Sequence, residues 1–267
     1  MCKLSLMGHV SGSMEDGKNQ ATTILITPVW KDSARLKAFG QELAVELAFR
    51  NSEVEWIIAD DGSGPEERKA LEGLGAEFAK IYPKVRVHYA EEHRGKGSVV
   101  REGWALEPEA AWYAFVDADG SVSAVEMLNL VETAQQSGNS TLAIRKNTDT
   151  TKVDEDFFRK LRHYGFLTAC HLIIGVKSED TQCGAKVLKG SDYRTIAGNL
   201  REVGLAFDAE LLAELAAAGF RWDEVPVNWS RVGGSRVHPW SDATDMLAAL
   251  FRIRGRLGNA SRSHNSG

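Results

Sequence analysis

The chain has 267 residues, of which 43% are hydrophobic, and a formal net charge of -5. This size allows one substantial core, so we expect one large α/β domain. The negative net charge argues against nucleic-acid binding, which depends on neutralising phosphates. The three cysteines lack Cys-x-x-Cys spacing, so neither a disulfide framework nor a zinc knuckle is indicated, and a reducing cytoplasm fits best.

The two ends of the chain predict little ordered structure. Residues 1–20 are polar after a short apolar start and lack the apolar core of a signal peptide, so we expect a flexible leader. Residues 258–267 are rich in Ser, Asn and Gly and predict a disordered tail. No stretch approaches the roughly 18 apolar residues that span a bilayer. We therefore expect a cytoplasmic protein, either free or in peripheral contact with a membrane.

The first half of the chain alternates strands with helices. Apolar runs predict strands at 22–27, 54–59, 85–89 and 112–117. Helices are expected at about 33–50 and 123–136. Between them, one helix is expected to begin at about residue 65, and a separate short helix is expected to follow residues 95–98 and to end at 105. This rhythm predicts right-handed crossovers and a Rossmann-like, mostly parallel central sheet flanked by helices on both faces. Ligands of such sheets bind outside the carboxyl ends of the strands.

The second half has a different rhythm. Short strands are expected at 142–144, 181–187 and 224–229. Helices are expected at about 155–176, 209–218 and 242–257. No linker separates two domains, so residues 21–257 are expected to form one domain.

Two carboxylates follow the apolar strand at 112–117. Asp117 and Asp119 are separated by one small residue and followed by Gly120, which lets the backbone turn tightly. At a strand end that opens into a polar crevice, such a pair can share Mg²⁺ or Mn²⁺ with the phosphates of a ligand. The alternative is two acids in an ordinary surface loop.

Other polar residues follow neighbouring strands. Asp60 and Asp61 precede Gly62 and can accept hydrogen bonds from a nucleobase or a ribose hydroxyl, although Asp-Gly turns are common. Lys96 stands between two glycines, which suits close approach to a phosphate but also an ordinary flexible loop. Together with Asp32, these residues are expected to meet on one rim of the sheet.

Three residues of the second half can carry chemistry. Asp208 opens the helix expected at 209–218, where an acid is a helix cap, a base, or a group that orients an acceptor. Arg231 and Arg236 flank two glycines in a loop. They could close over phosphates, since arginine binds phosphate bidentately, or form a solvated loop, the reading we favour for Arg231.

Taken together, the chain resembles family 2 glycosyltransferases of the GT-A fold, and among them the dolichyl-phosphate glucosyltransferases and their prokaryotic polyprenyl-phosphate relatives. The resemblance runs from about Thr23 to Arg254. Six segments carry it: Ile57-Ile58-Ala59-Asp60-Asp61-Gly62-Ser63; Gly95-Lys96-Gly97-Ser98-Val99-Val100-Arg101-Glu102-Gly103; Phe115-Val116-Asp117-Ala118-Asp119-Gly120; Asp180-Thr181-Gln182-Cys183-Gly184-x-Lys186; Phe207-Asp208-x-Glu210-Leu211-Leu212; and Glu224-Val225-Pro226-Val227-Asn228-Trp229 followed by Gly234-Ser235-Arg236.

The resemblance implies inverting transfer of a hexose, glucose or mannose, from a nucleotide diphosphate sugar, with UDP-glucose favoured, to a polyprenyl or dolichyl phosphate. It implies a nucleotide-binding half at 21–122, an acceptor-binding half at 123–257, and a metal held by Asp117 and Asp119. The nucleotide sugar would contact Pro28, Trp30, Asp32, Asp60, Asp61, Lys96, Gly97 and Asp117. The catalytic and acceptor side would hold Asp208, Gln182, Lys186 and Arg236.

The sequence also departs from the family pattern. The family usually has Pro-x-Tyr-Asn-Glu after the first strand, where this chain has Pro28-Val29-Trp30-Lys31-Asp32. Trp30 can stack as tyrosine would and Asp32 can replace the glutamate, but Lys31 has no such explanation. Ala185 stands where an aromatic is usual and Arg231 where an acid is usual. The eukaryotic relatives carry an N-terminal membrane anchor that is not expected in this chain.

Three other functions stay open. The acceptor could be a soluble saccharide, with Asp208 as general base. The protein could bind nucleotide sugars without turnover, which the altered Lys31 favours and the intact Asp117 and Asp119 oppose. A nucleotidyltransferase would need a glycine-rich loop after the first strand, which Thr27-Pro28-Val29-Trp30 is not.

The helix expected at 242–257 offers apolar residues and three arginines, a pattern of membrane-surface helices. The residues concerned are Met246, Leu247, Leu250, Phe251, Ile253, Arg252, Arg254 and Arg256. Ordinary packing of its apolar face against the core is the alternative that we favour.

Overall fold

A computed structural model describes residues 22–154, 157–233 and 241–264. The expected leader at 1–20, residues 265–267 and Arg236 lie outside the described residues. The central sheet contains β1 (Thr23–Val29), β2 (Val54–Asp60), β3 (Val85–Tyr89), β4 (Trp112–Val116), β5 (Ser140–Ile144), β7 (Ala185–Lys189) and β8 (Trp222–Pro226). The helices are α1 (Ser33–Phe49), α2 (Pro65–Ala79), α3 (Lys96–Ala105), α4 (Ala124–Ser137), α5 (Phe157–Ile173), α6 (Gly190–Ile196), α7 (Phe207–Ala217) and α8 (Ser241–His264), with a 3₁₀ turn at Ala197–Asn199.

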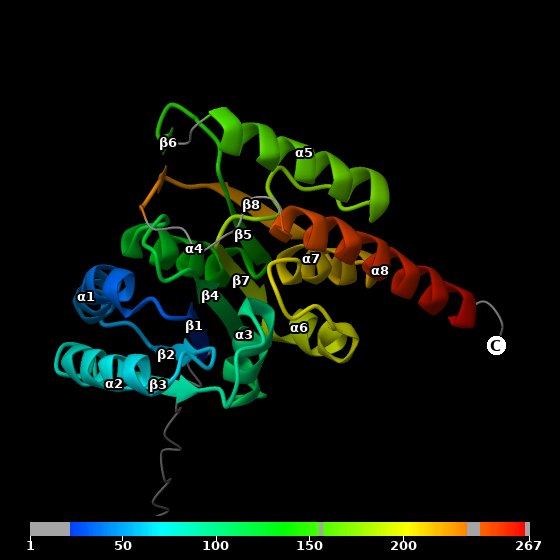
Figure 1. Ribbon diagram of the computed structural model, residues 1–267. Helices are drawn as coiled ribbons and strands as arrows, with labels where there is room; N and C mark the ends of the chain where they lie inside the picture. The colour runs from blue at the N-terminus through cyan, green and yellow to red at the C-terminus, as the bar shows by residue number, and fades with distance from the viewer. Residues whose placement is uncertain (1–21, 155–156, 234–240, 265–267) are drawn as a thin grey trace, which may run out of the picture.

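The seven strands lie in the order β3-β2-β1-β4-β7-β5-β8 (Figure 1). β1 pairs in parallel with β2 and β4, β2 with β3, and β5 with β8. β7 runs antiparallel to both of its neighbours, β4 and β5. The prediction of a mostly parallel sheet flanked by helices is therefore confirmed, and the reversed β7 is an addition to it.

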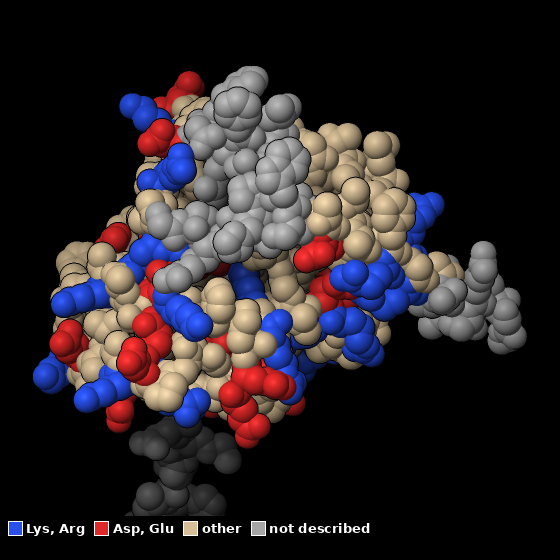
Figure 2. Space-filling view, in the orientation of Figure 1, with Lys and Arg blue, Asp and Glu red and all other residues tan. Residues whose placement is uncertain are grey.

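Helices cover both faces of the sheet (Figure 1). Because side chains alternate along a strand, Leu25 and Val29 of β1 belong to one core with α1, α2 and α4. Ile24 and Ile26 belong to a second core, to which α3, α6, α7 and α8 contribute. α8 packs against α5 and α7. Figure 2 shows acidic and basic side chains interspersed over the face in view, in keeping with the mixed charge of the chain.

Several element boundaries differ from expectation. The strand expected at 181–187, for example, is β7 at Ala185–Lys189. Three further differences have a physical reason. β1 continues through Pro28 to Val29, because its pairing with β4 ends at Ile26 and the missing amide hydrogen of proline costs no bond there. β8 ends at Pro226, and Trp229–Ser230 instead forms β9, which pairs with β6 (Val153–Asp154) in a separate small sheet. Two-residue strands have no alternation from which a sequence could reveal them.

The third difference concerns the C-terminal tail. Residues 258–267 were expected to be disordered, but α8 continues to His264. Once a helix is nucleated, each further residue adds one hydrogen bond, so a polar segment can prolong it. No helix among the described residues combines the length and the apolar character that crossing a bilayer requires.

Candidate active site

Four charged side chains alternate in sign across the centre of the molecule. Lys96 Nζ lies 2.8 Å from Asp117 Oδ1 and 3.1 Å from Asp208 Oδ2. Lys186 Nζ lies 2.6 Å from Asp208 Oδ1. Asp117 follows β4, Lys96 opens α3, Asp208 lies in the first turn of α7 and Lys186 lies in β7. The fold thus brings together, as one cluster, four residues that the sequence singled out in four separate segments.

Lys186 is fully buried within a strand of apolar residues. It occupies the face of β7 that is turned to α7, since Leu188, two residues on, belongs to the same core as α7. Its ammonium group also donates to the carbonyl oxygen of Cys183 at 2.8 Å. A buried charge is tolerated only when it is paired and hydrogen-bonded, and Lys186 meets both conditions.

Asp208 is not a helix cap. α7 begins at Phe207 with Ala206 as its N-cap residue, and both carboxylate oxygens of Asp208 face lysines. Burial raises the pKa of Asp208, but the charges and hydrogen bonds of Lys186 and Lys96 outweigh burial and hold that pKa below its ordinary value. The carboxylate therefore stays ionised near neutral pH.

Gly184 sets the position of Asp117. Its carbonyl oxygen accepts a hydrogen bond from the Asp117 amide at 2.9 Å. A Cβ atom at position 184 would lie 2.1 Å from Asp117 Oδ2, so only glycine fits beside this carboxylate. Desolvation of the partly buried Asp117 carboxylate raises its pKa, and the carboxylates of Asp119 and Asp208 add to the effect, whereas Lys96 opposes it.

Asp119 and Asp32 meet through an arginine that the sequence reading missed. Asp119 Oδ1 accepts the Ser121 amide at 2.9 Å, and its Oδ2 lies 3.5 Å from a guanidinium nitrogen of Arg35. The same guanidinium binds the Asp32 carboxylate, which makes no capping hydrogen bond to α1. Arg35 thus joins two of the predicted donor-side acids.

A small pocket of about 50 Å³ opens beside these carboxylates. It is lined by Asp117, Asp119, Ser121, Val122, Arg145, Gln182, Gly184 and Trp229. Asp180 holds the Arg145 guanidinium through bonds of 2.7 and 3.0 Å. The buried Gln182 Nε2 has no hydrogen-bond partner among the described residues. Arg145 was missed, although it follows β5 just as Asp117 follows β4, and the same strand-end rule points to it.

The predicted nucleotide-side acids hold loop backbone. Asp61 accepts the amides of Arg94 at 2.9 Å and Gly95 at 2.8 Å, and it lies 2.8 Å from His93 Nδ1. Asp60 is fully buried and accepts the Ser63 amide at 3.2 Å. These bonds fix the loop that leads into Lys96.

Trp30 and Lys31 contact the loops that follow β2 and β3. The Trp30 ring stacks on His93, with centroids 4.2 Å apart and planes inclined by 14°. Lys31 adopts a positive φ of 50°, and its amide donates to Ser63 Oγ at 2.8 Å. The departure from the family pattern at Lys31 therefore coincides with an unusual backbone conformation. Pro28 lies one residue before the end of β1, and Gly97 packs against Phe207.

Asp117 and Asp119 fit a divalent metal only with help from a ligand. The described residues contain no group of three or more His, Cys, Asp or Glu side chains that could hold an ion alone. The two side chains are 41% and 25% exposed, and both line the pocket. Two hard oxygen donors of this kind suit Mg²⁺ or Mn²⁺ when substrate phosphates complete the coordination.

Comparison with known proteins gives the family. The profile of the family described as Glycosyl transferase family 2 matches residues 26–182. A dolichyl-phosphate beta-glucosyltransferase of Dictyostelium discoideum is 27% identical, over 93% of this chain and 79% of the relative. The human dolichyl-phosphate beta-glucosyltransferase is also 27% identical, over 87% of this chain and 74% of the relative.

Solved structures agree on the fold. Glucosyl-3-phosphoglycerate synthase from Mycobacterium tuberculosis, in complex with Mn²⁺, UDP-glucose and phosphoglyceric acid, superimposes with a TM-score of 0.60 at 14% identity, over 95% of this chain and 86% of that chain. The mannosyltransferase PcManGT from Pyrobaculum calidifontis, in complex with GDP-Man and Mn²⁺, gives 0.56 at 12% identity, over 91% and 75%. The chain belongs to glycosyl transferase family 2, and it is a glycosyltransferase of the GT-A fold.

Proposed function

We propose that this enzyme transfers glucose from UDP-glucose to a polyprenyl or dolichyl phosphate with inversion at the anomeric carbon. The similar dolichyl-phosphate beta-glucosyltransferases support the acceptor and the sugar. The structural neighbour with UDP-glucose and Mn²⁺ supports the donor class. The observation that carries the proposal is the ion-paired state of Asp208 between two lysines.

That state supports a phosphate acceptor over a hydroxyl acceptor. A hydroxyl acceptor needs a general base, and a good base has a pKa near the working pH. Asp208 has a lowered pKa and both oxygens occupied, so it is a poor base. A phosphate acceptor is already anionic near neutral pH and needs none. Asp208 would then hold Lys96 and Lys186 in place and balance their charge.

The other residues have roles that follow from their positions. Asp117 and Asp119 would hold Mg²⁺ or Mn²⁺, which neutralises the charge that grows on a departing nucleoside diphosphate. Lys96, between two glycines, approaches the same diphosphate. The Gln182 amide presents a hydrogen-bond donor on the pocket wall, and the Arg145 guanidinium adds positive charge beside it, which suits an anionic acceptor. The role of Arg236 stays a prediction.

We also propose a peripheral contact with the membrane that holds the acceptor lipid. Leu250 and Ile253 of α8 are buried in the core, whereas Leu247 and Phe251 are 43% and 60% exposed. On α5, which packs against α8, Leu172 is 76% exposed. Three arginines of α8 are engaged within the protein, Arg252 and Arg256 with Glu202 and Arg254 with the Ile173 carbonyl, so the proposed contact relies on apolar side chains.

Product analysis tests the transfer. The protein is incubated with Mn²⁺ and radiolabelled UDP-glucose, GDP-mannose or UDP-galactose, together with either a polyprenyl phosphate or a saccharide. We expect label from UDP-glucose in the lipid fraction. Label found only in a soluble saccharide would establish the alternative acceptor, and donor binding without any transfer would favour the non-catalytic alternative.

Flotation with phospholipid vesicles tests the membrane contact separately. Wild-type protein should float, and a variant with Leu247→Ser and Phe251→Ser should stay at the bottom. Absence of flotation by the wild type would remove the membrane contact and leave the transferase assignment intact.

A further inference from the structure

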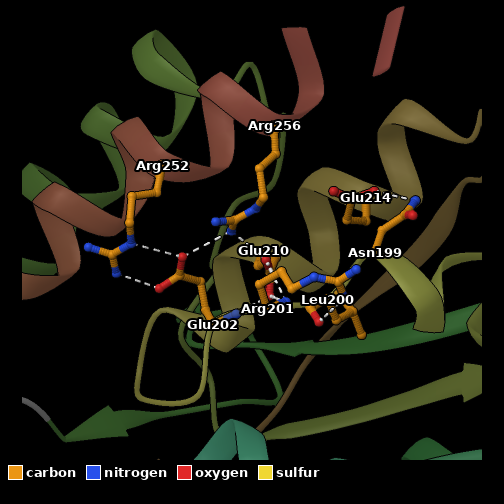
Figure 3. Close-up of polar contacts among 8 residues, drawn as sticks. All are labelled: Asn199, Leu200, Arg201, Glu202, Glu210, Glu214, Arg252 and Arg256. Atoms are coloured by element: carbon orange, nitrogen blue, oxygen red, sulfur yellow. Dashed lines mark hydrogen bonds and ion pairs between the residues drawn. The ribbon is translucent and has the colours of Figure 1, made fainter. Parts of the chain in front are cut away.

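A second polar cluster lies outside the pocket, where α7 and α8 meet (Figure 3). The carboxylate of Glu210 is fully buried and accepts the Arg201 amide at 3.0 and 2.9 Å and the Glu202 amide at 2.8 Å. It also pairs with Arg256 at 2.6 Å. Glu202 in turn binds Arg256 at 2.9 Å and Arg252 at 2.5 Å. None of these residues lines the pocket.

The backbone that Glu210 holds is a loop at residues 200–206, and this loop lies directly on the glycines around Lys96. The Val203 carbonyl accepts the Ser98 amide at 3.2 Å. A Cβ at Gly95 would lie 2.7 Å from the Val203 oxygen, and one at Gly97 would lie 2.8 Å from the Glu202 oxygen. The 200–206 loop therefore supports the start of α3 from one side, while Asp117 and Asp208 hold the Lys96 ammonium from the other.

One turn of α7 both pairs with the lysines of the active site and holds the 200–206 loop. Asp208 and Glu210 are two residues apart, which on a helix corresponds to about 200° of rotation, so their side chains leave the helix on opposite sides. Asp208 reaches the two lysines, and Glu210 reaches the 200–206 loop and α8. Any shift of the loop relative to α7 would change the distance from Lys96 to Asp208.

We propose that Glu210 and Arg256 are a positioning pair, which clamps the 200–206 loop between α7 and α8 and so fixes Lys96 at the diphosphate of the donor. The proposal rests on the proposed function for the role of Lys96. It gives α8 a part in donor binding that does not require α8 to touch the donor.

The test compares Glu210→Gln with Glu214→Gln. Glu214 is a buried carboxylate on the same helix, one turn further on. Its carboxylate accepts a hydrogen bond from the Asn199 amide group (Figure 3), with a length of 3.0 Å. A glutamine at 214 can still accept that bond. A glutamine at 210 must place its NH2 group where either Arg256 or a loop amide needs an acceptor, and it has lost the charge that pairs with Arg256. A second pair of variants on α8, Arg256→Met and Arg254→Met, covers the case in which Glu210→Gln fails to fold.

Urea unfolding measures the stability of each variant of the 267-residue chain. Two further readouts test the proposal. They are the amide hydrogen exchange of residues 95–99, and kcat and KM for UDP-glucose at a saturating concentration of acceptor. We expect Glu210→Gln and Arg256→Met to speed exchange there by about tenfold, the factor that corresponds to one lost hydrogen bond. We expect kcat/KM to fall by on the order of 10²-fold, as displacement of a catalytic constellation does. Glu214→Gln and Arg254→Met should match the wild type.

The proposal would be overturned if Glu210→Gln and Arg256→Met both had the same exchange rates at residues 95–99 and the same kcat/KM as the wild type. An equal loss in Glu214→Gln, in step with its loss of stability, would do the same, since it would indicate a purely structural role. If the wild type transferred no glucose, the proposed function would fail on its own, and exchange at residues 95–99 would still decide whether the clamp exists.

Discussion

Asp208 Oδ1 lies 2.6 Å from Lys186 Nζ, and the two side chains are 3% and 0% exposed. Such a buried pair contributes less to stability than its short distance suggests, because both charges lose their hydration. Removal of one partner is a different matter, since the other charge then remains buried without compensation. The pair therefore makes the fold depend on a residue that an apolar strand would not otherwise contain.

Lys186→Met tests this dependence. Methionine fills a similar volume but leaves Asp208 with Lys96 alone, so we expect the free energy of unfolding to fall by about 3–5 kcal/mol. Lys189→Met, at the exposed end of the same strand, should change it by less than about 0.5 kcal/mol. Urea denaturation measures both, and similar small losses in the two variants would contradict the argument.

Gly184→Ala should disturb the metal site by displacing the Asp117 carboxylate. The new Cβ would lie 2.1 Å from Asp117 Oδ2, so the carboxylate must move. We expect turnover to fall by on the order of 10²-fold, with a loss of stability of about 1–3 kcal/mol from overpacking. Gly198→Ala, where an added Cβ meets nothing within 4 Å, is the matched control. Calorimetric titration in the presence of UDP measures the affinity for Mn²⁺. If Gly184→Ala bound Mn²⁺ as tightly as the wild type, the placement of Asp117 in the metal site would be refuted.

Asp119→Asn should abolish the metal dependence of transfer. The amide keeps the shape of the carboxylate but removes half of the negative charge that Asp117 and Asp119 offer a cation, so we expect a loss of about 10²-fold or more in kcat. Asp154→Asn, in the exposed β6, should leave kcat unchanged. Treatment of the wild type with a chelator should reproduce the loss, and added Mn²⁺ should restore activity only in the wild type and the control. Full activity in chelator would end the metal assignment.

The link between Glu202 and α8 should depend on pH. Burial raises the pKa of Glu202, but hydrogen bonds and charges from Arg252 and Arg256 outweigh burial and hold the pKa below its ordinary 4.5. The unfolded chain therefore takes up this proton first as the pH falls. The stability that the Glu202 carboxylate contributes is complete above pH 4.5 and is lost as the pH falls through the lower pKa of the folded protein.

Unfolding curves of the wild type and Glu202→Gln check this sign. The difference in their unfolding free energies should be constant from neutral pH to the ordinary pKa and should shrink at more acidic pH. A Glu202 difference that grows in acid would mean that its pKa is raised, contrary to the geometry.

The first half of the fold was predicted well from the sequence, for a physical reason. Continuous apolar runs such as 112–116 are buried on both faces, and helices between them leave few alternatives to a parallel sheet. The same rule predicted that Asp117 and Lys96 would meet, because both follow strands. The direction of β7 could not be predicted, since an apolar run looks the same in either direction.

Side-chain pairing was harder to predict than strand ends. Lys186 within an apolar strand was singled out only by resemblance, and its partner Asp208 lies in another element, 22 residues away. Asp208 alone suggested a cap, because nothing local shows that a lysine will reach it first. Arg35 and Arg145 were overlooked, since an arginine near a helix start or a strand end is common on any surface.

The reversed strand β7 has a mechanical consequence. It is hydrogen-bonded to β4 on one side and to β5 on the other, so a single ladder runs without interruption from β3 to β8. A hinge motion between the two halves of the sheet would have to break that ladder. Any movement that encloses the substrates is therefore left to the segments that connect the strands. The sheet itself acts as a rigid support for the residues that position both substrates.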